Sequence, residues 1–197
     1  MAPSTQRSTA PNQVRIIGGR WRRRLIHFPQ SASLRPTPDR VRETLFNWLG
    51  QDLSELAVLD LFAGSGALSL ESLSRGARLA VAVDATREAV VALRENAAIL
   101  GAEGLEIHRA DALAYLGREQ RRFDIVFIDP PFSDEWLDRL WPLLPQCLNR
   151  GGWLYVEQPR EIVAPSGWTI FRHQSAGRVH YHLLRRESDS EVPEEIQ

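Results

Sequence analysis

Apolar and polar positions follow two alternating patterns along most of the chain. Short, nearly continuous apolar runs rich in Val, Ile and Leu are separated by stretches in which apolar residues recur at helical spacing. Five of these runs are predicted strands, and they cover residues 56–61, 79–84, 105–110, 123–129 and 153–157. The main predicted helices cover residues 67–75, 85–100 and 136–148, the last ended by Asn149-Arg150-Gly151-Gly152. Apolar strands that alternate with helices indicate a parallel sheet covered on both faces.

The two ends of the chain follow other patterns. Residues 169–173 and 179–184 are separated by a short turn that contains glycine, which predicts an antiparallel pair at the end of the sheet. Residues 14–18 and 24–28 flank Gly19-Arg20-Trp21 and predict a hairpin. A helix is predicted over residues 39–48, with Pro38 in its first turn and Thr37 as its cap. The expected fold is therefore a doubly wound, Rossmann-like α/β fold with a mostly parallel seven-stranded sheet, a terminal antiparallel strand and an N-terminal β-hairpin/helix extension.

Length and composition fit one folded domain with an appendage. With 197 residues, 43% of them hydrophobic, the chain can build one sizeable core. We expect a disordered tail at 1–13, an arginine-rich extension at 14–50, a main domain at 51–186 and an acidic disordered tail at 187–197. No apolar run reaches the roughly 18 residues that span a bilayer, and the N-terminus lacks the apolar core of a signal peptide. These features predict a cytoplasmic protein.

Cysteine and histidine give no sign of a metal centre. Cys147 is the one cysteine, so an intramolecular disulfide or a multi-cysteine zinc site is excluded, and we expect it in the core. The five histidines are dispersed, and no metal site is predicted.

Positive charge is concentrated near the N-terminus. Residues 1–47 contain nine arginines and two acidic residues, whereas the whole chain has a net charge of −1. A local excess of positive charge is typical of a surface that binds a polyanion. The predicted hairpin combines arginine with an aromatic residue, a mixture suited to phosphates and a stacked base or sugar. Its candidate RNA-binding residues are Arg15, Arg20, Trp21, Arg22, Arg23 and Arg24.

A glycine-rich turn follows the first predicted strand of the main domain. Asp60 ends that strand, and Gly64 and Gly66 precede a helix, as in nucleotide-binding turns where glycines allow the backbone to approach a ligand. The third glycine of the dinucleotide-binding pattern is replaced by Ser69, so a pyrophosphate site is poorly supported. An acid four residues before the first glycine instead suits a ligand with a positive amino or sulfonium group.

Two further acids are predicted to lie on the same edge of the sheet. Asp84 ends the second strand, where a carboxylate can accept hydrogen bonds from ribose hydroxyls. Asp111 follows the third strand, within reach of an adenine amine. Together with Asp60 they predict an adenosine-type site.

The most specific motif, Asp129-Pro130-Pro131-Phe132, ends the fourth strand, which should lie beside the first. The proline pair holds the chain extended, leaving the Pro130 carbonyl free as an acceptor beside the Asp129 carboxylate. Phe132 adds a flat face. Two acceptors and an aromatic ring suit a planar group with an NH2, whose nitrogen lone pair they would direct toward an electrophile. We therefore expect a catalytic site here, in which Asp129 can also take the released proton.

These motifs resemble those of S-adenosylmethionine-dependent amino-methyltransferases of class I. The strings RIIGGRWRRRL (15–25), LRPTPDRVRETLFNWL (34–49), LDLFAGSGALSLESLSRGA and FIDPPF are most similar to the RsmD family, whose members methylate N2 of a guanine, guanine 966, in bacterial 16S rRNA. The resemblance runs from about Arg15 to His182.

The resemblance implies a role for each motif. Asp60, Gly64 and Gly66 would line the methionine end of S-adenosylmethionine, Asp84 its ribose and Asp111 its adenine, and the Asp129–Phe132 segment would hold the base. Thr37 is assigned to the cofactor, and Arg35 and Arg40 to the RNA near the active site. Small-subunit rRNA, either free or in a partly assembled particle, is the expected partner of a monomeric enzyme. Glu71 and Glu157 are assigned no role and are interpreted as surface or strand-end acids.

Three other functions remain open at this point. An adenine-N6 DNA methyltransferase and a protein glutamine-N5 methyltransferase would use the same chemistry, although 197 residues leave little room for a DNA-recognition domain. The glutamine enzyme would have less use for the arginine hairpin. A non-catalytic RNA-binding assembly factor with the same fold is disfavoured because both motifs are intact.

Overall fold

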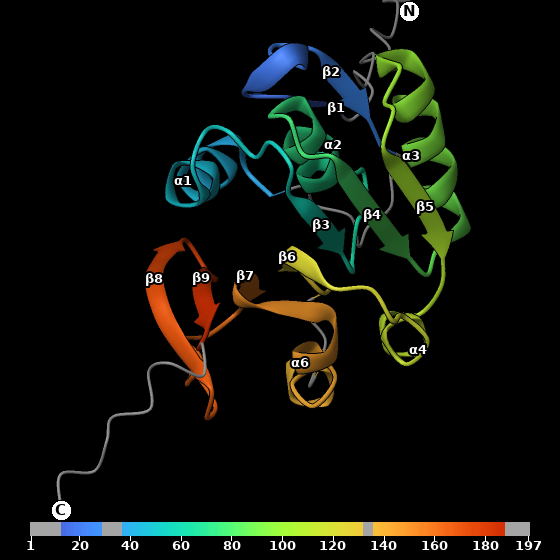
Figure 1. The fold of residues 1–197 in the computed structure, drawn as a ribbon. Helices are drawn as coiled ribbons and strands as arrows, with labels where there is room; N and C mark the ends of the chain where they lie inside the picture. The colour runs from blue at the N-terminus through green and yellow to red at the C-terminus, as the bar shows by residue number, and fades with distance from the viewer. Residues whose placement is uncertain (1–12, 29–36, 132–135, 188–197) are drawn as a thin grey trace, which may run out of the picture.

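A computed structural model describes residues 13–28, 37–131 and 136–187 of the chain (Figure 1). The elements begin with β1 (Gln13–Arg15), the 3-10 helix η1 (Gly19–Trp21), β2 (Leu25–His27) and α1 (Asp39–Leu49). The core then runs through β3 (Ala57–Asp60), α2 (Ala67–Ser74), β4 (Leu79–Asp84), α3 (Arg87–Leu100), β5 (Leu105–Arg109), α4 (Ala112–Leu116) and β6 (Phe123–Ile128). The last part contains α5 (Trp136–Leu140), α6 (Leu144–Cys147), β7 (Leu148–Gln158), β8 (Trp168–Ala176) and β9 (Val179–Arg186).

The seven-stranded sheet has the order β5-β4-β3-β6-β7-β9-β8. Strands β5 to β7 are parallel to one another, and β9 pairs antiparallel with both β7 and β8. The prediction of a doubly wound, mostly parallel sheet with an antiparallel end is confirmed. As predicted, β6 lies next to β3, so the strand order reverses between β3 and β6. Ligands of such sheets bind beside the carboxyl ends of the strands at this point.

Helices cover both faces of the sheet (Figure 1). The β1–β2 hairpin, α1, α2 and α3 contribute to one apolar core, and α4, α5 and α6 to the other. The predicted hairpin is confirmed, with strands of three residues each. Its residues Val14, Ile16 and Ile26 are buried in the same core as α2 and α3, so the extension is packed as part of the domain.

The predicted helix over residues 136–148 is wrong in its extent. Two short helices, α5 and α6, occupy the segment, because Pro142 and Pro145 have no N–H for a continuous helix. Strand β7 already begins at Leu148, before the glycine pair that was expected to be a turn. The register between β6 and β7 shifts between Phe123 and Ile125, and the extra residues of β7 lie opposite that shift.

The predicted disordered tails lie outside the described residues except at one position each. Gln13 belongs to β1, and the Glu187 N–H donates to the Gly167 carbonyl at 3.1 Å, so both end residues take part in the fold. The longest helix, α3, has 14 residues, and none of the helices that the structure describes is long and apolar enough to cross a membrane.

Candidate active site at the strand ends

Three of the predicted acids meet at one edge of the sheet. Asp60 ends β3, Asp84 ends β4 and Asp129 follows β6 directly. The negative charges of Asp129 and Asp84 both act on the Asp60 carboxyl, where they raise its pKa further than burial alone does. The structure therefore brings together the acids that the sequence placed at successive strand ends.

Asp60 is a buried carboxyl without a compensating cation among the described residues. Its residue is 2% exposed, and burial raises its pKa to about 7. Its hydrogen-bond partners are neutral: the Ser69 hydroxyl donates to its Oδ2 at 2.7 Å, and the backbone N–H of Phe62 also donates to the carboxyl. A ligand with a positive charge next to this carboxyl would stabilise its ionised form, so the site fits the amino or sulfonium group of S-adenosylmethionine.

The glycine turn between β3 and α2 depends on its two glycines. Gly64 and Gly66 have φ values of +51° and +81°, in the left-handed region that side chains disfavour. A Cβ on Gly66 would also lie 2.0 Å from Leu93 Cδ1 of α3. The turn is therefore packed directly against α3, leaving no room for a larger residue.

Asp84 holds the same turn from β4. Its Oδ2 accepts from the Gly64 N–H at 2.9 Å, and its Oδ1 accepts from the N–H and hydroxyl of Thr86 at 2.8 and 2.7 Å. Oδ1 thus uses both of its lone pairs, whereas Oδ2 keeps one for a ribose hydroxyl.

Asp111 lies at the end of β5, as predicted, and caps α4. Its Oδ1 accepts from the N–H groups of Leu113 and Ala114 at 3.0 and 3.1 Å. The residue is exposed, and its adenine contact stays a prediction.

Asp129 is fixed by a residue from the segment before α1. The Thr37 hydroxyl donates to Asp129 Oδ2 at 3.0 Å. The expected helix cap is wrong, because α1 begins after Pro38 and has no side-chain cap. Pro130 is buried and Pro131 exposed, whereas Phe132 lies outside the described residues. Thr37 thus lies at the predicted catalytic acid, and its assignment to the cofactor is untested.

Glu157 is a buried acid next to Asp129. Its interpretation as a surface or strand-end acid without a role did not predict this position. The residue is 4% exposed, and the Tyr155 hydroxyl donates to its Oε1 at 2.7 Å. Burial raises the pKa of both Glu157 and Asp129, and the charge of Asp129 raises the pKa of Glu157 further. The available signal was its place at the end of the strand that follows the Asp-Pro-Pro strand.

Glu71 was interpreted as a surface acid, and this is wrong. Its side chain is fully buried in α2 and accepts from the backbone N–H groups of Ile17 and Gly18, each at 2.7 Å. Arg75 Nε donates to Glu71 Oε1 at 2.8 Å, and Arg42 of α1 lies 3.7 Å from Oε2. One carboxylate thus joins the hairpin, α1 and α2.

A second contact, which was not predicted from the sequence either, fixes the end of β2. Asn96 of α3 is 1% exposed, accepts from the His27 N–H at 2.8 Å and donates to the His27 carbonyl at 2.7 Å. Its Nδ2 also donates to the Ser65 carbonyl in the glycine turn at 3.2 Å. The hairpin is thereby connected to the candidate cofactor site.

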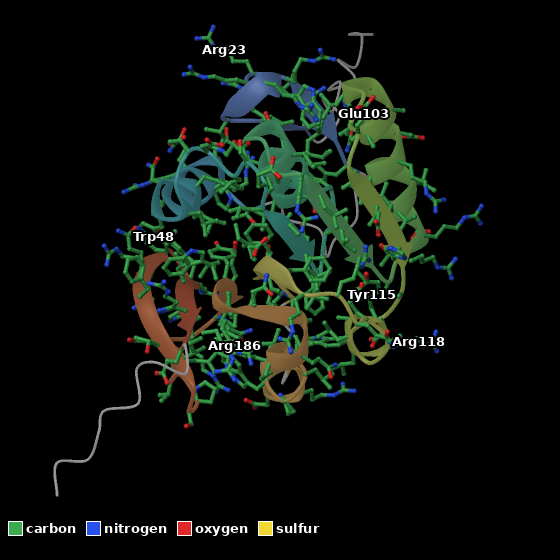
Figure 2. The ribbon with its side chains drawn as sticks, in the orientation of Figure 1. Arg23, Trp48, Glu103, Tyr115, Arg118 and Arg186 are labelled. Atoms are coloured by element: carbon green, nitrogen blue, oxygen red, sulfur yellow. The ribbon has the colours of Figure 1, made fainter. Side chains whose placement is uncertain are left out.

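The arginines of the hairpin are exposed, whereas its tryptophan is not. Figure 2 shows Arg23 pointing away from the body of the protein. Trp21 is 8% exposed, belongs to the core and is covered by Arg20, whose Cζ lies 4.2 Å from the ring centroid. Its position does not support the expected stacking on a base. The exposed candidates for RNA contact are Arg15, Arg20, Arg22, Arg23, Arg24 and Arg40, while Arg35 lies outside the described residues.

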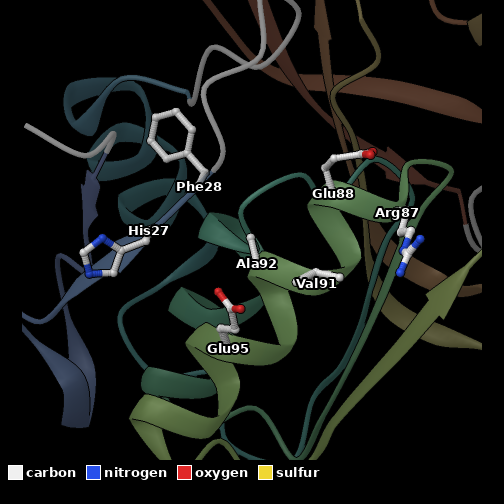
Figure 3. A pocket seen from close by; sticks show the side chains of 7 residues that line it. All are labelled: His27, Phe28, Arg87, Glu88, Val91, Ala92 and Glu95. Carbon is white, nitrogen blue, oxygen red and sulfur yellow. The ribbon is translucent and has the colours of Figure 1, made fainter. Parts of the chain in front are cut away.

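A surface hollow of about 480 Å³ lies between the end of β2 and α3 (Figure 3). Its lining comprises His27, Phe28, Arg87, Glu88, Val91, Ala92 and Glu95. The hollow runs along the first part of α3, and none of the acids at the strand ends lines it. Its mixed charges do not define a ligand class.

Cys147 is buried in the core, as predicted. Across residues 13–28, 37–131 and 136–187, no group of three or more His, Cys, Asp or Glu side chains is arranged to hold a metal ion.

The sheet order, with a glycine turn after β3 and the acids beside it, defines the Rossmann-like fold of class I methyltransferases. The family model described as "Conserved hypothetical protein 95" matches residues 14–185. Ribosomal RNA small subunit methyltransferase D of Escherichia coli (strain K12) is 42% identical over 188 residues, covering 91% of this chain and 93% of that protein. The protein of the same name from Haemophilus influenzae is 36% identical, covering 91% and 97%.

A solved structure of a putative methyltransferase from Escherichia coli superposes with a TM-score of 0.82. It is 41% identical and covers 90% of this chain and 99% of that one. The chain therefore belongs to the family of ribosomal RNA small subunit methyltransferase D, the RsmD family.

Proposed function

We propose that this protein transfers a methyl group from S-adenosylmethionine to the exocyclic N2 amine of a guanine in 16S rRNA, guanine 966 by family resemblance. The observation that carries the proposal is the position of Asp129, fixed by Thr37 at the same strand edge as the buried Asp60 carboxyl and the glycine turn. An acceptor for an amine and a site for a cationic cofactor thus lie side by side. The names of the relatives from Escherichia coli and Haemophilus influenzae support rRNA as the substrate.

The geometry of the turn supports the roles proposed for the cofactor residues. Asp60 would face the positive amino or sulfonium group, the Gly64–Gly66 backbone would pack along the methionine part, and Asp84 would accept from the ribose. When bound, S-adenosylmethionine supplies an electrophilic methyl carbon on a sulfonium sulfur. Asp111 would accept from the adenine amine with its remaining lone pairs.

The substrate amine needs activation, because its lone pair is delocalised into the purine ring. Asp129 would accept a hydrogen bond from N2–H, orient the amine and take the proton that N2 loses when the N–C bond forms. The Pro130 carbonyl and Phe132 would complete the holder for the base. A base can reach this pocket only after it leaves its stack, which is easiest in an RNA loop.

The arginine hairpin would provide the RNA contact. Its exposed arginines carry charge toward solvent and are suited to phosphates, whereas the buried Trp21 is left out of this surface. We propose that the protein acts as a monomer in the bacterial cytoplasm, where its rRNA substrate is made, on free rRNA or a partly assembled small subunit.

Methyl transfer from tritiated S-adenosylmethionine to rRNA from cells without this protein tests the proposal. Free 16S rRNA and small-subunit particles are compared, and the modified nucleotide is mapped. We expect one N2-methylguanine and a loss of at least about 100-fold in kcat for Asp129→Ala. Labelling of DNA adenine or protein glutamine, or Asp129→Ala activity equal to the wild type, would contradict the proposal. Specific rRNA binding without transfer would favour a non-catalytic assembly factor.

A further inference from the structure

Two acidic residues lie near the carboxyl ends of the neighbouring strands β6 and β7. These strands are parallel, and Ile128 lies opposite Val156, so the next residues, Asp129 and Glu157, lie side by side. Neighbouring strands are about 4.8 Å apart. Because Ile128 and Val156 belong to the core beneath the sheet, both acids point to the opposite face, the face of α1.

Thr37 lies next to both carboxyl groups. Its hydroxyl donates to Asp129 Oδ2 at 3.0 Å. A hydrogen bond between the same side chain and Glu157 lowers the pKa of Glu157, which is the effect of a hydroxyl that donates to an ionised carboxylate. A hydroxyl has one proton and two lone pairs. Since that proton is given to Asp129, the same hydroxyl cannot also donate to an ionised Glu157. Its oxygen can only accept from Glu157, and Glu157 must then carry the proton of that hydrogen bond.

The other hydrogen bond of Glu157 has the same direction. Tyr155 donates its hydroxyl proton to Glu157 Oε1 at 2.7 Å, and this leaves Oε2 as the oxygen that can carry the proton. A continuous chain of donors then runs from Tyr155 through Glu157 and Thr37 to Asp129. Arg42 Nε supports the chain by donating to the Thr37 carbonyl at 3.3 Å.

We propose that Glu157 is a positioning residue that stays protonated and, through the Thr37 hydroxyl, fixes Asp129 with its Oδ1 presented to the substrate amine. This inference rests on the function proposed above. From the described residues, no hydrogen bond reaches Asp129 Oδ1. The two neighbouring acids then have one negative charge in total, and Asp129 is the ionised member of the pair.

The chemistry balances without a change in the charge of Glu157. As the amine nitrogen forms its bond to the methyl carbon, the bond from that carbon to sulfur breaks and its electron pair stays on sulfur. The nitrogen loses one proton to Asp129 Oδ1. Glu157 keeps its proton throughout and acts only through Thr37.

The surroundings of Glu157 disfavour its ionisation. The groups that face it are Asp129 of β6, Tyr155 of its own strand, Thr37 before α1 and its register partner Tyr181 of β9, with Asp60 beyond Asp129. None of these groups is a cation. Burial and the charge of Asp129 raise the pKa of Glu157 to about 8, and they outweigh the hydrogen bonds of Tyr155 and Thr37, which lower it.

The variants Glu157→Gln and Glu157→Ala test whether Glu157 acts as a hydrogen-bond donor or as a base. The glutamine amide accepts from Tyr155 and donates to Thr37, so it reproduces the neutral carboxyl, whereas alanine removes both hydrogen bonds. We expect Glu157→Gln to stay within about threefold of the wild-type kcat at pH 7, and Glu157→Ala to lose roughly tenfold or more, with the KM for cofactor unchanged in both. Equal loss in both variants would overturn the proposal.

The pH profile gives a readout that a purely structural role would not change. In the wild type, kcat should fall at high pH as Glu157 loses its proton, whereas Glu157→Gln has no such proton and should keep its rate there. An unchanged alkaline fall in Glu157→Gln would also overturn the proposal. If Glu157→Ala does not fold, Thr37→Val and Thr37→Ser replace it: valine should lose roughly tenfold and serine should restore the rate. Equal rates for valine and serine would overturn it.

The same assay separates this inference from the proposed function. If the wild-type protein transfers no methyl group to rRNA, the proposed function and this inference both fail. If it does, and Asp129→Ala is inactive while Glu157→Gln is as slow as Glu157→Ala, the function stands and only the role of Glu157 fails.

Discussion

Glu71 of α2 accepts a hydrogen bond of 2.7 Å from the backbone N–H of Gly18, 53 residues earlier in the chain. The same carboxylate is paired with the buried Arg75 and lies near the buried Arg42. A buried charge of this kind stabilises a fold only while its partners are present. This side chain outside the arginine hairpin therefore helps to fix the hairpin's position.

Glu71→Gln keeps the shape of the side chain and removes its charge, so it should leave two buried guanidinium groups undercompensated. We expect the free energy of unfolding to fall by about 3 kcal/mol. Glutamine keeps one acceptor oxygen, so hydrogen-exchange protection should be lost at whichever of the Ile17 and Gly18 amides then faces the NH2 group. Glu103→Gln, an exposed acid in the turn after α3, is the matched control and should change stability by less than about 0.5 kcal/mol. Equal effects of the two changes in denaturant unfolding would contradict the buried network.

Replacing Arg22, Arg23 and Arg24 with alanine should weaken RNA binding and flatten its dependence on salt. Each lost phosphate contact lowers the slope of log K against log salt by about one unit. Cofactor affinity should stay at the wild-type value. The matched control replaces three exposed arginines of other elements, Arg118, Arg160 and Arg178. Equal losses of RNA affinity in the two triple variants, or loss of cofactor binding, would count against the hairpin as the RNA contact.

Asp60→Asn should stabilise the cofactor-free protein and abolish cofactor binding. The pKa of Asp60 is about 7 in the folded protein against 3.8 for an ordinary aspartate, so between these values the folded state binds more protons and loses stability as pH rises. At pH 8 the variant should gain roughly 2–4 kcal/mol over the wild type, and at low pH, where Asp60 is protonated, the gain should vanish. Thermal unfolding at pH 4 and pH 8 measures the difference, and an equal gain at both values would refute the assignment.

Gly66→Ala should destabilise the protein more than the same change at another left-handed glycine. At Gly66 the new Cβ would lie 2.0 Å from Leu93 Cδ1, whereas at Gly177, with φ of +62°, nothing lies within 4 Å. Backbone strain of about 1 kcal/mol applies to both, and overpacking adds about 1–3 kcal/mol at Gly66 only. Chemical denaturation of the two variants tests this, and similar losses would show that the turn is not packed against α3.

The sheet and the acids at its edge could be predicted because their signals are local. Apolar runs determine the strands, and parallel strands bring their carboxyl ends to one edge, so Asp60, Asp84 and Asp129 are placed by topology alone. The Asp-Pro-Pro motif and the glycine turn are contiguous in sequence. Family resemblance then connected them to one reaction.

The contacts that position the site could not be predicted, since they join distant parts of the chain. Glu71 and Asn96 resemble ordinary helix residues until the hairpin packs on them, and nothing near Trp21 in sequence shows that its ring is buried. Thr37 occupies a sequence position typical of a helix cap, but tertiary packing directs its hydroxyl to Asp129.

Two of the hairpin's attachments, Glu71 at Ile17 and Gly18 and Asn96 at His27, have a thermodynamic consequence for recognition. A segment that is already rigid loses little conformational entropy when a partner binds, so more of its interaction energy appears as affinity. An RNA that bound to the hairpin, as proposed, would have to adapt its own shape to a fixed array of guanidinium groups. Selectivity at this surface would then depend on how readily the nucleic acid deforms, because the protein surface keeps its shape.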